Sequence, residues 1–145
     1  MGEYRIFIDS DVIIDLVAHR AEFAAAAELF SLVERRAVEG FTSPVVLANV
    51  EYIIGKYSSK AKARKAISSL LQRITVLPMD HSTAQQAIES KFSDFEDALQ
   101  YFTAKRGEVD VIVTRNKKDY LQGKITVLTA REFVDLHESA EQPEA

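Results

Sequence analysis

Residues 4–11 read YRIFIDSD, a short apolar run that ends in acidic and hydroxyl side chains. Tyr4 to Ile8 is too short for a helix and is rich in residues that favour strands. Asp9 and Ser10 are typical of a strand end followed by a helix cap. The stretch therefore predicts a first strand whose carboxyl end carries carboxylates.

The same alternation of short apolar runs and longer helical stretches continues along the chain. Further strands are expected at 41–43, 74–77, 109–114 and 125–128. Helices are expected at 12–18, 23–38, 44–56, 59–72, 82–91, 94–106 and 130–137. Gly40 is expected to close the second of these helices. Alternating strands and helices indicate an α/β protein with a mainly parallel sheet.

The 145 residues are enough for one domain with one sizeable core, and too few for two. We expect that domain at 1–137. At 138–145, Glu, Ser, Gln and Pro replace apolar residues, which predicts a disordered acidic tail. No apolar run approaches the length of a membrane span, and the start lacks a signal-peptide pattern. The sequence therefore favours a cytoplasmic protein.

Composition also limits the chemistry. The absence of cysteine excludes a disulfide framework, a thiolate nucleophile and a cysteine-ligated metal centre. The net charge of −4 gives no overall attraction for nucleic acid. A phosphate-bearing substrate would therefore need a local basic patch or a bound cation.

Acidic side chains are expected at one edge of the predicted sheet. Asp9 and Asp11 follow the first strand, and Asp119 follows the fourth. Asp94 and Asp97 open a helix at a spacing that places both carboxylates on one face. In an open parallel sheet, ligands bind beyond the carboxyl ends of the strands. This convergence of separate segments predicts a functional site.

Each acid also has an ordinary structural explanation when it is taken alone. Ser93 and Glu96 have the spacing of a capping box, and carboxylates in a first helical turn are stabilised by the helix dipole. Asp9 can cap the helix that follows it. The functional interpretation rests on the whole set of acids.

Carboxylates held close together repel one another unless a cation lies between them. An all-oxygen set, without cysteine and with three scattered histidines, favours Mg²⁺ or Mn²⁺ over Zn²⁺. Such ions assist the hydrolysis of phosphodiesters. Arg115, Lys117 and Lys118 lie beside the predicted site, where we expect them to bind substrate phosphates.

Three segments together resemble the ordered motifs of PIN domains: FIDSDVIID at 7–15, DFEDALQ at 94–100 and VIVTRNKKDY at 111–120. The likeness spans residues 5–136. It implies a three-layer α/β/α fold with a five-stranded parallel sheet of order 3-2-1-4-5. It also implies a ribonuclease that depends on Mg²⁺ or Mn²⁺. For small bacterial members it implies a VapC-like toxin that acts on RNA and is held by an antitoxin protein.

The resemblance also implies roles for single residues. Asp9 would be a principal metal ligand and Asp97 the acid that opens the fourth conserved helix of the fold. Asp94 would be an auxiliary acid, while Asn116 and Asp119 would form the polar pair after the fourth strand. The expected catalytic and metal-binding set is Asp9, Asp94, Asp97 and Asp119.

One position departs from the pattern of the family. Its members commonly carry an acid six residues beyond a serine that corresponds to Ser43, and this chain has Asn49 there. Glu51 lies about 200° further round the helix and does not replace it without a local shift. Asn116 likewise stands where many members have Asp. Asn49, Glu51, Asn116 and Asp11 are therefore kept as auxiliary polar residues.

Two other functions remain open. Asp9-Ser10-Asp11 also resembles the nucleophile motif of haloacid-dehalogenase phosphatases, although Asp94 and Asp97 precede the fourth strand where that motif set expects later acids. A catalytically degenerate PIN domain that only binds RNA or protein is the other alternative, and Asn49 is its main support. The sequence leaves open the RNA target, the number of metal ions and whether a homodimer forms.

Two further groups are assigned to ordinary structure. The first is a basic helix face that we expect to be solvated: Lys60, Lys62, Arg64 and Lys65. The second is a set of aromatic residues that we expect in the core: Tyr52, Tyr57, Tyr101 and Phe102.

Overall fold

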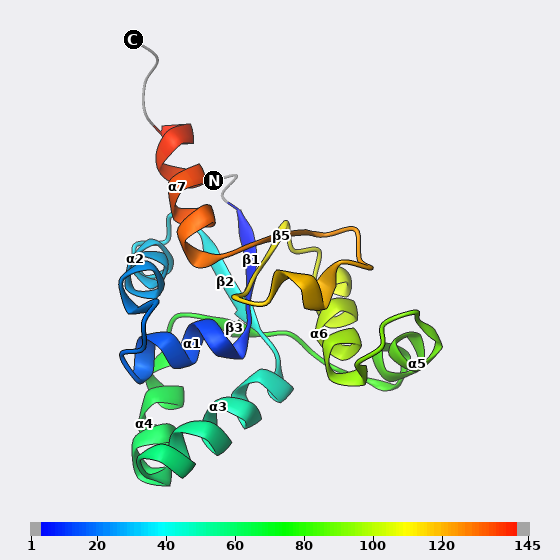
Figure 1. Cartoon of the computed structure of the whole chain (residues 1–145), viewed down its shortest axis with the longest axis horizontal. Coiled ribbons are helices and arrows are strands. Elements are labelled where there is room, and N and C mark those ends of the chain that lie inside the picture. The colour runs from blue at the N-terminus through cyan, green and yellow to red at the C-terminus, as the bar shows by residue number, and fades with distance from the viewer. Residues whose placement is uncertain (1–3, 142–145) are drawn as a thin grey trace.

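A five-stranded parallel sheet lies at the centre of the computed structural model, which describes residues 4–141 (Figure 1). The strands are β1 (Arg5–Ile8), β2 (Glu39–Thr42), β3 (Thr75–Val76), β4 (Val111–Val113) and β5 (Thr126–Leu128). Their order is β3-β2-β1-β4-β5, and every neighbouring pair is parallel. The predicted fold class and strand order are confirmed.

Helices cover both faces of this sheet. They are α1 (Ser10–Val17), α2 (Phe23–Glu34), α3 (Pro44–Tyr57), α4 (Lys60–Leu70), α5 (His81–Glu89), α6 (Phe95–Arg106) and α7 (Ala130–Glu141), with a short 3-10 helix η1 (Lys117–Tyr120). α1 packs against α2 and α3, α2 also contacts α7, and α5 packs against α6. In Figure 1, α2 and α7 therefore lie on one side of the sheet and α5 and α6 on the other.

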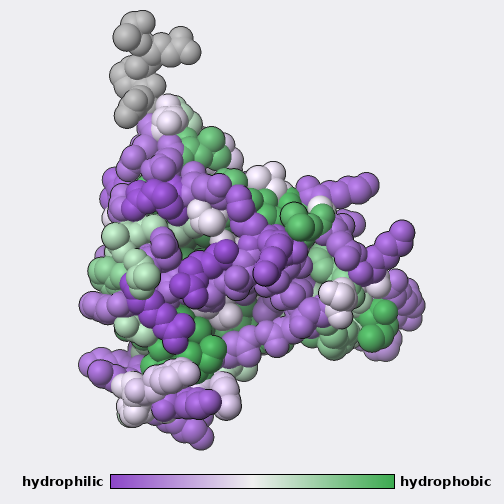
Figure 2. All heavy atoms as spheres, in the orientation of Figure 1, coloured by the Kyte–Doolittle hydropathy of each residue, from purple (hydrophilic) through white to green (hydrophobic). Residues whose placement is uncertain are grey.

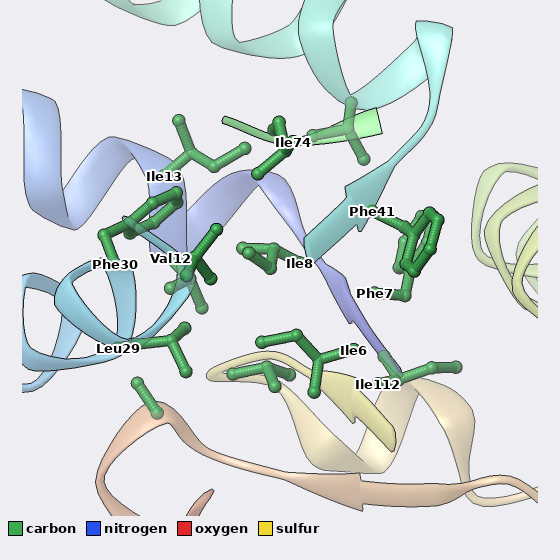
Figure 3. Packing of buried hydrophobic residues seen from close by; sticks show 14 of the residues in the cluster. Ile6, Phe7, Ile8, Val12, Ile13, Leu29, Phe30, Phe41, Ile74 and Ile112 are labelled. Atoms are coloured by element: carbon green, nitrogen blue, oxygen red, sulfur yellow. The ribbon is translucent and has the colours of Figure 1, made fainter. Parts of the chain in front are cut away.

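The central strand is buried on both faces, as expected for a parallel sheet with helices on each side. Ile6, Phe7 and Ile8 are each 0% exposed. Figure 3 shows Ile8 directed toward Val12 and the helices beyond it, whereas Phe7 lies with Phe41 on the opposite side. Apart from Arg5 at its start, β1 carries no polar side chain, so functional residues at its carboxyl end can begin only after Ile8.

The second helix is shorter than predicted, and Gly40 has a different role. α2 ends at Glu34, and Arg36 adopts a left-handed backbone with φ 63°. This turn frees residues 39–42 to pair with β1 as β2. A Cβ at Gly40 would lie 2.9 Å from Cγ2 of Ile74. Gly40 therefore allows close packing inside β2 and does not close the helix.

Two predicted boundaries near the chain's acidic segments are also corrected. α6 begins at Phe95 with Asp94 as its N-cap, so the predicted capping box of Ser93 and Glu96 does not form. The Asp94 carboxylate is the better acceptor, because Oδ1 reaches the backbone N–H of Asp97 at 2.9 Å. The last helix continues to Glu141, so 138–141 are helical, and 142–145 of the expected tail lie outside the described residues.

The aromatic prediction is correct for only part of its set. Tyr101 is 5% exposed and Phe102 packs against the core, as predicted. Tyr52 and Tyr57 are 68% and 73% exposed, so the prediction for them is wrong. Tyr52 lies on the side of α3 opposite the buried Val50, whereas Tyr57 is the last residue of the helix, beyond its buried part. Among the helices within residues 4–141, none combines the length and apolar character needed to cross a membrane.

A buried polar pair joins α3 to α6 below the carboxyl ends of the strands. The Ser43 hydroxyl caps α3 by accepting from the N–H of Val46 at 3.1 Å. The same hydroxyl donates to Oε1 of Gln100 at 2.5 Å. Ser43 and Gln100 are 0% and 2% exposed. The pair holds the start of α3 against α6, the two helices that flank the sheet edge.

Replacing Ser43 with Ala is expected to lower the free energy of unfolding by about 2 kcal/mol, because it removes a helix cap and leaves the buried Gln100 oxygen without its donor. Urea denaturation followed by circular dichroism measures this loss. Ser59→Ala is the matched control, since Ser59 caps the exposed start of α4 without a buried partner. An equal loss in both variants would contradict a role for the buried hydrogen bond.

Candidate functional site

The carboxyl ends of β1 and β4 place Asp9 beside Thr114. Ile8 pairs with Val113, and the N–H of Asp9 donates to the carbonyl oxygen of Val113 at 3.0 Å. The Thr114 hydroxyl then donates to Oδ2 of Asp9 at 3.1 Å. Two residues that lie far apart in the sequence are therefore neighbours because their strands end together.

Asp9 accepts hydrogen bonds on both carboxylate oxygens. Oδ1 accepts from the N–H of Ser10 at 2.8 Å, so Asp9 also caps α1 as the sequence suggested. Oδ2 accepts from the hydroxyl of Tyr120 at 2.9 Å, in addition to Thr114. Burial raises the pKa of Asp9, the three hydrogen bonds oppose that shift, and the negative charge of Asp119 adds to it. The structure holds the Asp9 carboxylate in one orientation.

Asp11 fastens the loop that follows β4. Its Oδ2 accepts from the hydroxyl of Thr114 at 3.2 Å, the N–H of Arg115 at 3.1 Å and Nδ2 of Asn116 at 3.2 Å. Burial, followed by the charge of Asp9, raises the pKa of Asp11 to about 6. These contacts make Asp11 and Asn116 positioning residues for the loop that leads to η1.

Asp97 lies at the start of α6 within a group of negative charges. Desolvation, followed in decreasing order by the charges of Asp94, Asp119, Asp9 and Glu96, raises the pKa of Asp97 to about 7. The acids predicted from separate segments therefore form one electrostatic cluster: Asp9, Asp94, Asp97 and Asp119.

The two auxiliary residues of α3 have different positions. Nδ2 of Asn49 donates to Oε1 of Glu96 at 2.5 Å, so Asn49 faces the start of α6 and the acid cluster. Glu51 instead pairs with Nε of Arg64 on α4 at 2.8 Å. The structure thus brings Asn49 to the site and places Glu51 away from it, as the angle between them on the helix requires.

The three basic residues beside the site are not equally available for a substrate. Arg115 pairs with the carboxylate of Asp15 at 3.2 Å, and Lys117 pairs with Glu132 at 2.9 Å. Lys118 is exposed and has no ion pair within residues 4–141. The expectation that all three hold phosphates stays a prediction, and Lys118 fits it without breaking an existing contact.

Replacing Arg115 with Met is expected to lower the free energy of unfolding by about 2 kcal/mol at pH 8, because Asp15 is 1% exposed and would lose its opposite charge. Burial already raises the pKa of Asp15 and Arg115 lowers it, so the variant raises that pKa further. As the pH falls, protonation of Asp15 removes its buried, unpaired charge. The loss of stability should therefore shrink toward pH 4. Urea denaturation at both pH values measures this, and an equal loss at each would contradict the account. In the control, adding Asp15→Asn should restore most of the stability at pH 8.

Two residues of the site carried no predicted role. Tyr120 is 1% exposed and donates to Asp9, and Thr114 is 0% exposed and donates to both Asp9 and Asp11. Both lie within the last motif quoted above, but a Thr after a strand and a Tyr after an acid are common in ordinary structure. The signal that identifies Thr114 is its position one residue beyond β4, opposite Asp9.

The acid cluster suits a hard divalent cation in chemistry and charge, although its side chains do not point to one common position. Within residues 4–141, no group of three or more acidic or histidine side chains is arranged to hold a metal ion as it stands. The cluster nevertheless offers only oxygen donors, and its acids mutually raise the pKa of Asp97. A cation among them would relieve that repulsion. Figure 2 shows that hydrophilic residues occupy the centre of the face it presents.

The chain is similar to known proteins in sequence and in fold. The family model described as the PIN domain matches residues 5–118. Ribonuclease VapC1 of Aquifex aeolicus is 27% identical over 141 residues, which cover 93% of this chain and 96% of that protein. A toxin-antitoxin complex from Klebsiella pneumoniae contains a chain that is 21% identical, with a TM-score of 0.65 over 86% of this chain and 97% of that one. PAE2754 from Pyrobaculum aerophilum is 16% identical, with a TM-score of 0.62 over 94% of this chain and 90% of that one.

Proposed function

We propose that this chain, which belongs to the PIN domain family, is a ribonuclease that hydrolyses RNA phosphodiester bonds. The observation that carries the proposal is the cluster of acids that β1, α6 and η1 bring together at one sheet edge. The similarity to a protein named Ribonuclease VapC1, along nearly the full length of both chains, supports the same activity.

We assign the binding of Mg²⁺ or Mn²⁺ to Asp9, Asp94, Asp97 and Asp119. When bound, such an ion lowers the pKa of a coordinated water and neutralises charge on the phosphate. The chain's own residues prepare the site for it. Thr114 fixes the Asp9 carboxylate through its hydroxyl, as does Tyr120.

The start of α6 organises the other half of the site. Asp94 accepts from the N–H of Asp97 and so fixes the first turn of the helix. The positive end of the helix dipole lies beside the carboxylates that the helix presents. Asn49 supplies a neutral amide, held by Glu96, where many family members carry an acid. The remaining acids must therefore provide the charge that attracts the cation.

Lys118 is the basic residue that we assign to a substrate phosphate. It lies on η1, directly after the loop that Asp11 fastens, and its ammonium group has no ion pair within residues 4–141. Arg115 and Lys117 support that loop through Asp15 and Glu132, and contribute positive charge beside it.

We further propose that the protein is the toxin of a toxin-antitoxin pair. The similarity of its fold to a chain of the Klebsiella pneumoniae toxin-antitoxin complex supports this role. Expression of the chain alone should then arrest growth, and co-expression of a neighbouring gene's product should relieve the arrest and yield a complex. Normal growth during production of an active enzyme would contradict the toxin role without affecting the nuclease assignment.

The activity is tested by incubating purified protein with labelled single-stranded RNA in Mg²⁺ or Mn²⁺. We expect cleavage that EDTA stops and that added Mn²⁺ restores. A protein that is folded, free of any co-purified inhibitor and inactive with both ions would favour the alternative of a degenerate PIN domain that only binds. Membership of the PIN domain family argues against the haloacid-dehalogenase phosphatase alternative.

A further inference from the structure

A basic depression lies between α6 and the loop that follows η1. Its volume is about 250 Å³, and three lysines border it: Lys91, Lys105 and Lys124. Aromatic rings form part of its wall. Phe92 packs against Phe102 at a centroid distance of 6.2 Å, and Nζ of Lys105 lies 5.9 Å from the centroid of the Phe102 ring. The depression thus combines positive charge with apolar ring surface.

The positive charge of the depression is not balanced by the protein. No acidic residue lines it, and none of its three lysines forms an ion pair within residues 4–141. The neighbouring Arg106, by contrast, is paired with Asp80. The whole chain carries a net charge of −4, so three unpaired lysines around one depression run against its overall composition. Their mutual repulsion would be relieved by an anionic ligand.

The depression is connected to the acid cluster by the two elements that carry the acids. Asp97, Tyr101 and Lys105 follow one another at intervals of four residues on α6, so they lie along one side of the helix. Eight residues of helix place Lys105 about 12 Å along the axis from Asp97. On the other side, the Tyr101 hydroxyl accepts from the N–H of Lys124 at 2.9 Å, which ties the loop after η1 to α6.

We propose that this depression binds the single-stranded RNA that flanks the scissile bond, with the lysines holding phosphates and the Phe102 ring packing against a base. The proposal rests on the ribonuclease function given above and extends it to the substrate's flank. Phosphate contacts from lysine and stacking on aromatic rings are the usual means by which proteins bind single strands without strict sequence preference. At its distance from Asp97, the depression would contact RNA a few nucleotides from the cleaved bond.

Binding is measured in EDTA, so that no cleavage occurs, with a fluorescent pool of random-sequence 12-nucleotide RNAs. The variant carries Lys91→Gln, Lys105→Gln and Lys124→Gln. We expect at least tenfold weaker binding and a salt dependence of log K that is shallower by about 2, because two to three phosphate contacts are lost. Phe102→Leu, which keeps an apolar side chain, should weaken binding about fivefold.

The matched control carries Lys60→Gln, Lys62→Gln and Lys65→Gln on α4, with the same change of net charge. These lysines are likewise exposed and form no ion pair within residues 4–141, and they lie on α4, where Lys62 borders a separate depression beside Ile54 and Tyr57. We expect the control to bind RNA within about twofold of the wild type. An equal loss in both triple variants would overturn the proposal, because a general effect of charge would then explain it.

Cleavage assays separate this proposal from the ribonuclease function. We expect the depression variant to show a raised KM for the 12-nucleotide RNA and an unchanged kcat. If the wild type cleaves RNA, and the wild type and both triple variants bind RNA equally, the proposed RNA-binding depression is overturned and the ribonuclease function is not. Weaker binding by the depression variant, with no cleavage by the wild type, would overturn the nuclease and support the subsite. A changed elution volume in size exclusion, with unchanged RNA binding, would overturn the subsite in favour of a protein contact.

Discussion

Replacing Asp97 with Asn is expected to lower RNA cleavage by about a hundredfold or more. The substitution removes one negative charge from the centre of the acid cluster, where the carboxylates of Asp9 and Asp119 lie near enough to raise the Asp97 pKa. Loss of an anionic ligand weakens the attraction for a divalent cation and removes charge stabilisation at the phosphate. Initial rates with saturating RNA, at several Mn²⁺ concentrations, measure the effect.

The same substitution is expected to stabilise the metal-free protein above neutral pH. The pKa of Asp97 is raised from 3.8 to about 7, so the folded state binds this proton more tightly than the unfolded state. The stabilisation from that proton is complete below about pH 4 and is lost as the pH rises to about 7. Asp97→Asn lacks this dependence, and after allowance for solvent screening it should be about 1 kcal/mol more stable than the wild type at pH 8.

Opposite changes in activity and stability distinguish a functional carboxylate from a structural one. Urea denaturation in EDTA, at pH 4.5 and pH 8, gives the stabilities, and the difference between variant and wild type should nearly vanish at the lower pH. Asp135→Asn is the control, because Asp135 lies exposed on α7 and its change of charge is the same. Cleavage at the wild-type rate by Asp97→Asn would show that the site is wrongly assigned.

The fold was largely predictable because its signals are local and repeated. Arg5 to Ile8 forms a strand whose last three residues are buried on both sides, and runs of this kind leave little choice of class. The errors occur where a boundary depends on contacts distant in sequence. Gly40 has the local appearance of a helix terminator, and only the approach of Ile74 explains why a glycine lies inside β2.

The candidate site was predictable in its acids and much less so in the residues that position them. Strand ends and helix starts are visible in the sequence, and they bring Asp9 and Asp97 to one edge. The partner of each side chain depends on register and rotamer, which composition does not reveal. Arg115 is adjacent to the site in sequence, yet its guanidinium pairs with the buried Asp15. The sequence gives no sign of a role for Tyr120, because its hydroxyl acquires a function only where η1 approaches Asp9.

Replacing Tyr120 with Phe is expected to raise the Mn²⁺ concentration needed for half-maximal cleavage about tenfold or more. The hydroxyl of Tyr120 donates to Oδ2 of Asp9 at 2.9 Å and is one of two side-chain donors to that oxygen. Without it, the carboxylate is oriented by Thr114 and by the N–H of Ser10 alone, and metal affinity depends on such orienting contacts. Cleavage rates across a Mn²⁺ titration measure the change.

The shape of that titration separates orientation from a direct catalytic role. A residue that only orients Asp9 should become dispensable when Mn²⁺ saturates, so Tyr120→Phe should then cleave within about threefold of the wild type. Tyr52→Phe is the control, because Tyr52 is 68% exposed on α3 and its hydroxyl makes no hydrogen bond within residues 4–141. A lowered maximal rate with an unchanged Mn²⁺ midpoint would contradict the orienting role. That result would instead mean that the Tyr120 hydroxyl acts on the substrate itself.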